Sequence, residues 1–282
     1  MESLNPPSWI ITTFAFIFGA LWGSFANVCI HRIPAGVSVV WPPSRCPACL
    51  SPVRAWDNVP VLSWLLLSAR CRDCKSAISS RYPLVEFISA VLSAVIAYGS
   101  TNLFSYLVFF GLTLSLVILS FIDIDEWYLP DVIIYPGIIC GLLISLLGPV
   151  SPAGMQTTIH DSLLGLLIGG GSFFIIGLVF KLVARKEGLG MGDTKLMAMI
   201  GSFLGWKAIL PVIFLSAFQG TIVGLILLYM KGKRGTVFGT DPKTIGGDFT
   251  ITSHHVPYGP FISLGAIEWM LFGTGMLKIF QQ

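Results

Sequence analysis

Charged residues are scarce in this sequence, and their scarcity decides its structural class. Asp, Glu, Lys and Arg make up only 11% of the 282 residues, against about 25% in soluble domains. Hydrophobic residues account for 54%, and the mean hydropathy is +0.82. These values exclude an ordinary soluble enzyme and predict an all-α polytopic membrane protein. The net charge of +3 gives no indication of a nucleic-acid partner.

Several catalytic motifs are also missing. The chain has no His-Glu-x-x-His metalloprotease motif and no recognisable serine–histidine pair. A dinucleotide-binding loop of the Gly-x-Gly type is absent too. The first apolar stretch, Trp9–Ile30, lacks the basic start and the Ala-x-Ala cleavage site of a signal peptide, so we expect a retained helix.

Apolar stretches close to bilayer length recur along the chain. About 20 residues are needed to cross the hydrocarbon core as a helix, and five stretches reach that length. Three shorter stretches are weaker candidates, so the sequence predicts about eight spans. The long candidates are Trp9–Ile30, Leu103–Ile122, Ser162–Val183, Ile209–Met230 and Pro260–Phe280, and the shorter ones are Leu84–Tyr98, Val132–Leu147 and Leu196–Trp206.

Basic residues fall on one side of this predicted topology. If the eight spans alternate, only Lys207 and Lys278 of the 17 Lys and Arg residues lie on the opposite side. The positive-inside rule then makes the basic side cytoplasmic. Both termini would face outward, and the acidic residues that follow the third span would lie at the cytoplasmic face.

The only sizeable soluble stretch, residues 35–83, carries two Cys-x-x-Cys knuckles. Their four thiols, Cys46, Cys49, Cys71 and Cys74, match the spacing of a tetrathiolate zinc site. Two disulfides or four free thiols are the alternatives, and a reducing cytoplasmic side disfavours disulfides. With sulfur at all four positions the zinc site would be structural, because it would staple a loop too small to build its own core.

Carboxylates gather beside apolar stretches at two places. Asp123, Asp125, Glu126 and Asp131 follow the third predicted span, and Asp193 lies in a glycine-rich turn before the sixth. Asp123 directly ends its span, where the helix dipole disfavours an anion, so it is a functional candidate. Asp131 is placed to cap the next helix. Two carboxylates brought together at one membrane face could form the dyad of an aspartic protease.

Polar residues near the first two spans allow more than one interpretation. Asn27 and His31 either anchor and pack the first helix or help to bind a substrate or cofactor. Glu86 either favours the N-terminus of the second span or pairs with Arg81 or Arg32.

Two features of the later spans predict contacts between helices. Glu268 lies within the last span, where a carboxylate is expensive to bury, and we expect it to hydrogen-bond to a neighbouring helix. Gly165-Leu-Leu-Ile-Gly169 and Gly220-Thr-Ile-Val-Gly224 have the small-xxx-small pattern of tightly packed helices.

Five motifs follow one another from the first predicted span to the sixth. They are Gly23-Ser-Phe-x-Asn-Val-x-Ile-x-Arg-Ile-Pro34, the Cys-x-x-Cys knuckles around Asn58-Val-Pro-x-x-Ser-Trp64, Ser79-x-Arg-Tyr-Pro-Leu-Val-Glu86, Ile122-Asp123-x-Asp-x-x-x-Leu-Pro-Asp131 and Glu187-Gly-x-Gly-x-Gly-Asp-x-Lys-Leu196. With the closing Pro257-Tyr-Gly-Pro260, they make the chain resemble the bacterial type IV prepilin peptidase family. Their joint order is far more specific than the short Gly-x-Gly-Asp motif alone.

The resemblance implies an eight-span aspartic protease of the bacterial inner membrane that acts at the cytoplasmic face. It implies a catalytic pair of Asp193 and Asp123, with Asp125 as the alternative within the acidic stretch. Members of the family remove the leader of type IV prepilins and pseudopilins after a Gly. Many then N-methylate the new terminus with S-adenosylmethionine. Residues 1–100 would form an N-terminal region with the zinc loop, and residues 101–282 a six-span protease domain.

Other functions stay open on the sequence. A secondary transporter would need carboxylates near the midplane in two similar halves, whereas most acids here lie at the cytoplasmic edge. A zinc-containing scaffold of a secretion apparatus would explain the knuckles and the spans and would leave the aspartates structural. A peptidase without methyltransferase activity is a further alternative, because methyl transfer depends on the resemblance alone and no residue is assigned to its cofactor.

Overall fold

The apolar stretches of the sequence fold as α-helices. The structure, a computed structural model, describes residues 8–147, 157–184, 190–233 and 256–280. Within these ranges it contains isolated β-bridges and no β-strand. The prediction of an all-α membrane protein is therefore confirmed.

Each of the eight predicted spans coincides with one helix. Between the first two spans lie a short helix, α2 (Leu62–Leu66), and a turn of 3₁₀-helix, η1 (Ala55–Asn58). A second turn of 3₁₀-helix, η2 (Trp206–Ala208), precedes α8. The long helices are α1 (Ser8–Arg32), α3 (Arg81–Gly99), α4 (Leu103–Glu126), α5 (Asp131–Leu146), α6 (Ile159–Ala184), α7 (Met191–Leu204), α8 (Ile209–Lys233) and α9 (Gly259–Phe280).

Five helices in the described part of the chain are long and apolar enough to cross a bilayer. They are α1, α3, α4, α6, and α8 together with η2. Helix α7 has 14 residues, which span only about 21 Å at 1.5 Å per residue, less than the roughly 30 Å of a hydrocarbon core. The count of eight crossings therefore stays a prediction.

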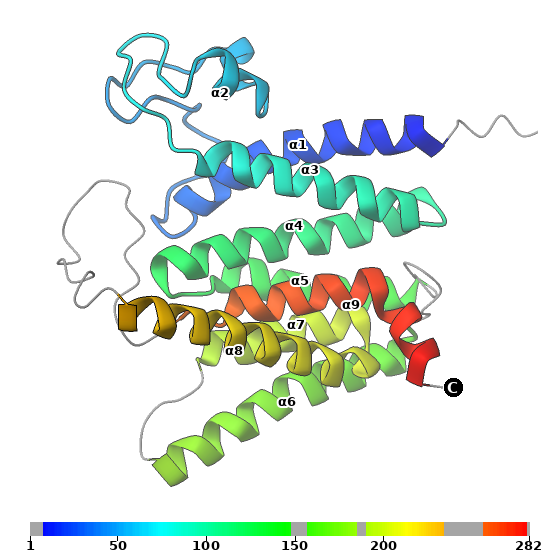
Figure 1. The fold of residues 1–282 in the computed structure, drawn as a ribbon. Coiled ribbons are helices and arrows are strands. Elements are labelled where there is room, and N and C mark those ends of the chain that lie inside the picture. Colours follow the sequence, from blue (N-terminus) through cyan, green and yellow to red (C-terminus); the bar gives the residue numbers. More distant parts are fainter. Residues whose placement is uncertain (1–7, 148–156, 185–189, 234–255, 281–282) are drawn as a thin grey trace, which may run out of the picture.

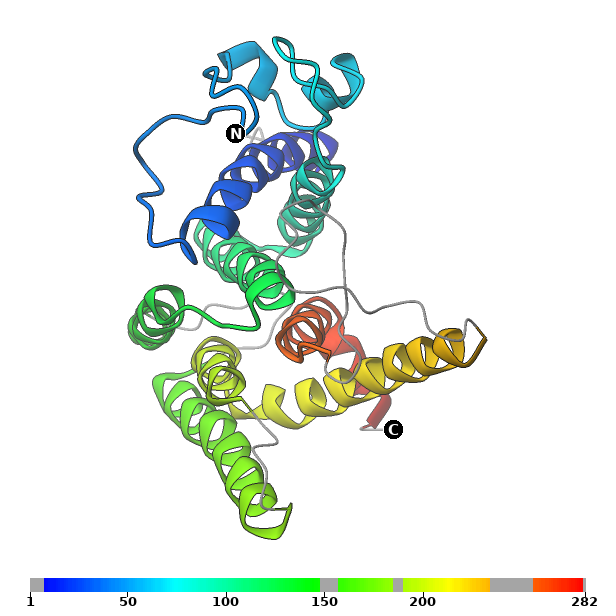
Figure 2. The same ribbon diagram turned by 90° about the vertical axis from the view of Figure 1, so that its left-hand side faces the viewer.

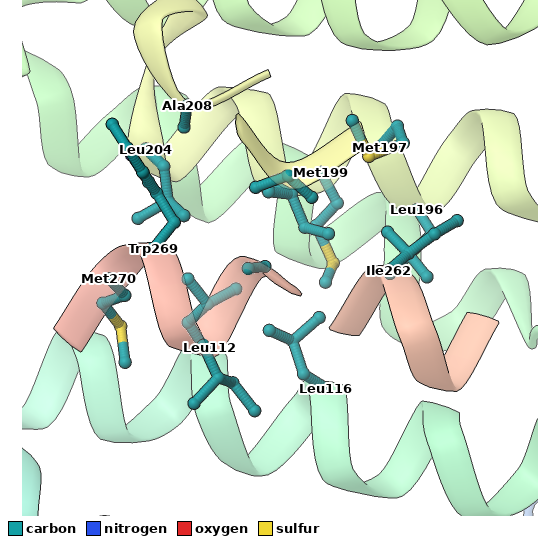
Figure 3. Packing of buried hydrophobic residues seen from close by; sticks show 14 of the residues in the cluster. Leu112, Leu116, Leu196, Met197, Met199, Leu204, Ala208, Ile262, Trp269 and Met270 are labelled. Atoms are coloured by element: carbon teal, nitrogen blue, oxygen red, sulfur yellow. The ribbon is translucent and has the colours of Figure 1, made fainter. Parts of the chain in front are cut away.

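Helix α4 lies at the centre of the bundle, between two groups of helices (Figures 1 and 2). One side of α4, with Val117 and Ile118, packs in an apolar cluster with α1 and α3. The other side, with Leu112 and Leu116, packs in a second cluster with α7 and α9. Figure 3 shows this second cluster, in which Leu112 and Leu116 of α4 lie in one apolar layer with residues of α7 and α9 such as Met199 and Trp269. The arrangement brings the ends of α4, α7 and α9 together.

Close backbone contacts at glycines hold particular helix pairs together, as expected where lipid supplies little hydrophobic driving force between spans. A Cβ on Gly165 of α6 or Gly201 of α7 would overlap the backbone of the other residue. The prediction of tight packing for Gly165–Gly169 is thus confirmed. The equivalent prediction for α8 is wrong, because a Cβ on Gly220 would make only ordinary contacts, and one on Gly224 would meet no atom of the described residues within 4 Å.

We predict that Gly201→Ala destabilises the protein. Alanine normally stabilises a helix by about 1 kcal/mol relative to glycine, but here its methyl group would overlap the backbone of Gly165. Overpacking of this kind costs about 1–3 kcal/mol. Thermal unfolding in detergent should therefore show a lower midpoint for Gly201→Ala. Gly224→Ala is the matched control, since open space surrounds it, and a midpoint as low as that of Gly201→Ala would contradict the packing account.

Candidate active site

Asp123 lies in the last turn of α4 and is buried, with 7% of its surface exposed. Its Oδ2 atom accepts a hydrogen bond of 3.0 Å from the backbone N–H of Gly259, the first residue of α9. The carboxylate is thus at the unfavourable C-terminal end of its own helix but at the favourable N-terminal end of another. This contact compensates for the position that singled Asp123 out in the sequence.

Gly259 has no room for a side chain. A Cβ at this position would lie 2.6 Å from Oδ2 of Asp123, well inside van der Waals contact. Only glycine therefore lets the start of α9 approach the carboxylate closely enough to donate to it.

Asp193 lies in the first turn of α7, and its carboxylate lies beside Gly190, the N-cap residue of that helix, where a Cβ would be 3.4 Å from Oδ2 of Asp193. It is close enough to Asp123 for the two charges to interact. Gly192 fits against Leu129 in the connection between α4 and α5, where a Cβ would lie 3.1 Å from the leucine side chain. Glu187 and Gly188, which open this motif, lie outside the described residues.

Two other aspartates of the region have cationic partners. Asp125 pairs with Arg81 at 2.5 Å, and Asp131 pairs with Lys195 at 2.8 Å. The predicted cap by Asp131 is wrong, because the N-cap of α5 is Pro130 and no side chain caps that helix. No basic side chain in the described ranges pairs with Asp123 or Asp193. These two carboxylates can therefore accept and donate protons.

Tyr258 borders the same site. Its hydroxyl group lies 2.9 Å from Oγ of Ser216 in α8, and its ring stacks on Phe173 of α6 at 6.4 Å. It is also close enough to Asp193 to feel its charge. Reasoning from residue chemistry missed Tyr258 and Gly259, and the only signal for them was the closing Pro-Tyr-Gly-Pro match.

The four cysteines of the two knuckles converge on one point. Their sulfur atoms all lie within 4.8 Å of one another, and the Sγ atoms of Cys46 and Cys74 are 3.8 Å apart. Four sulfurs around a tetrahedral Zn²⁺ at 2.3 Å are separated by about 3.8 Å. The donor set and its spacing therefore fit a tetrathiolate metal site.

The two knuckles have the same backbone geometry. The residue after each second cysteine, Leu50 or Lys75, has a φ of 60° and donates its N–H to the carbonyl of the first cysteine. Hydrogen bonds from the backbone N–H groups of Cys49 and Ala48 lower the pKa of the Cys46 thiol to about 6. Such donors favour the thiolate form, which is the form that binds metal.

The remaining polar candidates have partners within the protein. Asn27 donates to the carbonyl of Tyr82 at 3.0 Å, and the His31 ring lies 5.4 Å from the Tyr82 ring. These contacts between α1 and α3 agree with anchoring and packing. Of the two alternatives for Glu86, pairing with Arg81 or Arg32 is wrong, because its Oε2 atom accepts a hydrogen bond from the backbone N–H of Val61 at 2.8 Å.

Glu268 has the partner in a neighbouring helix that the sequence predicts. Its Oε2 atom accepts a hydrogen bond from the side-chain amide of Gln219 in α8. The expected contact between helices is confirmed, and it supplies one reason for a carboxylate in this span.

Comparison with known proteins gives consistent matches. Residues 17–100 match the model of the bacterial peptidase A24 N-terminal domain, and residues 109–225 match that of the type IV leader peptidase family. A prepilin leader peptidase/N-methyltransferase of Aeromonas salmonicida is 34% identical, over 99% of this chain and 96% of its own. Proteins of the same name from Pseudomonas aeruginosa (31% identical, over 99% of this chain and 95% of the relative) and Myxococcus xanthus (40%, over 80% and 66%) are also similar. No solved structure matches. The chain therefore belongs to the type IV leader peptidase family.

Proposed function

We propose that the protein is a membrane aspartic endopeptidase that removes the leader of type IV prepilins and pseudopilins after a Gly. The observation that carries this proposal is the pair of carboxylates, Asp123 and Asp193, each at the N-terminal end of a helix and close enough to interact. The names of the relatives add the substrate class. The alternative of a zinc-containing scaffold is not favoured. A scaffold would leave the two carboxylates without a catalytic role, whereas the chain belongs to a peptidase family.

The chemistry follows from the pair. Two neighbouring carboxyl groups without a cation cannot both ionise cheaply, so one of them retains a proton. The ionised group takes a proton from water as the water attacks the scissile carbonyl. The protonated group donates to the carbonyl oxygen, and a proton then passes to the departing amine. The N–H of Gly259 keeps one oxygen of Asp123 fixed during these steps.

We place the reaction at the cytoplasmic face of a bacterial inner membrane. The excess of Lys and Arg on that side of the predicted topology supports this orientation. The apolar stem of a prepilin would enter the bilayer beside the helices. Its Gly junction would then emerge at the depth of the two carboxylates.

The second activity in the relatives' name, N-methyl transfer, extends the proposal. S-adenosylmethionine would supply the methyl group for the new amino terminus of the pilin. We propose the domain division that the sequence predicts, in which residues 1–100 form an N-terminal region and residues 101–282 form the peptidase domain. Neither region is assigned a residue that holds the methyl donor.

We further propose that Cys46, Cys49, Cys71 and Cys74 hold one structural Zn²⁺. The mutual distances of their sulfur atoms support this assignment. A site closed by four thiolates leaves no position for a substrate, so the metal would stabilise the loop and take no part in peptide cleavage.

We predict that Asp123→Asn and Asp193→Asn each abolish leader cleavage. Either change removes a group that accepts or donates the proton, and general acid–base catalysis contributes about 10²–10⁴-fold to rate. Cleavage of a full-length prepilin by the purified, detergent-solubilised variants measures the loss.

Asp125→Asn and Asp131→Asn are matched controls from the same acidic stretch. Each breaks a partly exposed ion pair, and such pairs contribute only about 0–1 kcal/mol. Both variants should therefore keep most of the activity. Loss of cleavage in Asp125→Asn with retention in Asp123→Asn would show that the pair is assigned to the wrong residue.

Zinc content provides a separate prediction. The purified protein should contain one Zn²⁺ per chain by elemental analysis, and Cys49→Ser should lose it. Because the metal staples the loop, residues 35–83 should become sensitive to limited proteolysis in the variant before the helices are affected. Metal-free wild-type protein with a protease-resistant loop would contradict the assignment.

A further inference from the structure

Helix α2 presents an apolar face to the outside of the protein. Leu62, Leu65 and Leu66 are spaced at i, i+3 and i+4, so they share one face of this short helix, and they are 58%, 59% and 85% exposed. The neighbouring Trp64 points the other way, because its Nε1 atom donates to the carbonyl of Ile78 at 3.1 Å. The helix is therefore anchored by Trp64 and leaves its leucines uncovered.

The position of α2 relative to the spans is fixed by Glu86. The backbone N–H of Val61, directly before α2, donates to Glu86 at 2.8 Å, and Glu86 lies five residues into α3. Five residues correspond to about 7.5 Å along a helix axis. Figure 1 accordingly shows α2 beside the first turns of α3 rather than beyond its end. Figure 2 shows the same segment on the outer side of α1 and α3.

The segment around α2 carries the other residue types found at membrane surfaces. We call residues 38–80, between α1 and α3, the cysteine module. Two of its tryptophans, Trp41 and Trp56, are exposed, and tryptophan is enriched where a bilayer meets water. Arg45, Arg70 and Lys75 are exposed as well, and none of the three makes an ion pair within the described part of the chain. Unpaired cations of this kind attract anionic lipid headgroups.

From these observations we propose that the cysteine module is a membrane-surface-binding unit. The leucine face of α2 lies among the upper acyl chains beside α3, and the free cations of the module contact anionic headgroups. An apolar face is costly in water but is stabilised at this depth, where lipid covers it. Glu86 holds the module at that depth through Val61. The inference does not depend on the catalytic pair.

Photolabelling by lipid tests the apolar contact. The intact, zinc-loaded protein is placed in vesicles of phosphatidylcholine and phosphatidylglycerol with a trace of phospholipid that carries a diazirine near the top of its acyl chain. After irradiation, mass spectrometry should find lipid adducts on the peptide that contains Leu62–Leu66. The double variant Leu65→Gln/Leu66→Gln should lose these adducts while keeping its zinc and the adducts on α8. The matched control Leu50→Gln, at an exposed leucine of the first knuckle, should keep them.

The results distinguish lipid from a second copy of the chain as the cover of the leucine face of α2. An unlabelled α2 in the wild-type protein, with α8 labelled, would overturn the proposal. Protein crosslinks from α2 to a second copy of the chain would also overturn it, because that copy would then cover the leucines.

The charge contribution is tested by Arg45→Gln/Arg70→Gln/Lys75→Gln. This variant should lose the higher α2 labelling expected in phosphatidylglycerol vesicles at low salt, and an unchanged preference would refute the role of the cations.

Discussion

The hydrogen bond from the backbone N–H of Gly259 to Asp123 is the interaction on which the proposed active site depends. It joins the C-terminal end of α4 to the N-terminal end of α9 at one face of the bundle. Asp193 lies in the first turn of α7, beside its N-cap residue Gly190. A helix N-terminus stabilises an anion through a partial positive charge, whereas a lysine or arginine would neutralise it with a full charge. Asp123 can therefore be buried, and Asp193 half-buried, and both can still exchange protons.

The packing around α7 explains how so short a helix can carry one of the two carboxylates. Its 14 residues pack against α5, α6 and α9, so its ends need not reach both surfaces of a bilayer. Gly201 fixes its distance to α6, and Met199 fills the space beside Gly137 of α5. The position of Asp193 is thus set by contacts along the whole helix.

Much of this architecture could be predicted from the sequence, because the responsible signals are local. Apolar stretches predicted every long helix, and the Cys-x-x-Cys spacing predicted four converging sulfurs. The dipole argument separated Asp123 from its acidic neighbours. The backbone donors to Asp123 and Glu86 could not be predicted, because every residue except proline has an N–H group and nothing in the sequence marks those of Gly259 and Val61. The ion pair between Asp131 and Lys195 joins residues 64 positions apart, and a capping pattern gave the wrong partner for that reason.

Small-residue patterns show the same limit of local reasoning. The Gly-x-x-x-Gly stretch of α6 packs against α7, whereas that of α8 does not bring a second backbone close. The two patterns are alike in sequence, and only the arrangement of the neighbouring helices distinguishes them. Glu86 is a second example, because the sequence left a helix N-terminus or a cation as its partner, and the fold supplied the loop N–H of Val61.

The most direct measurement of the central claim is the mass of a full-length prepilin after incubation with the detergent-solubilised protein, with and without S-adenosylmethionine. The account predicts a chain shortened to a new N-terminus directly after a Gly, methylated only when the methyl donor is present. A shortened chain that is never methylated would contradict the second activity alone. A prepilin of unchanged mass in both reactions would contradict the account of this protein as a leader peptidase.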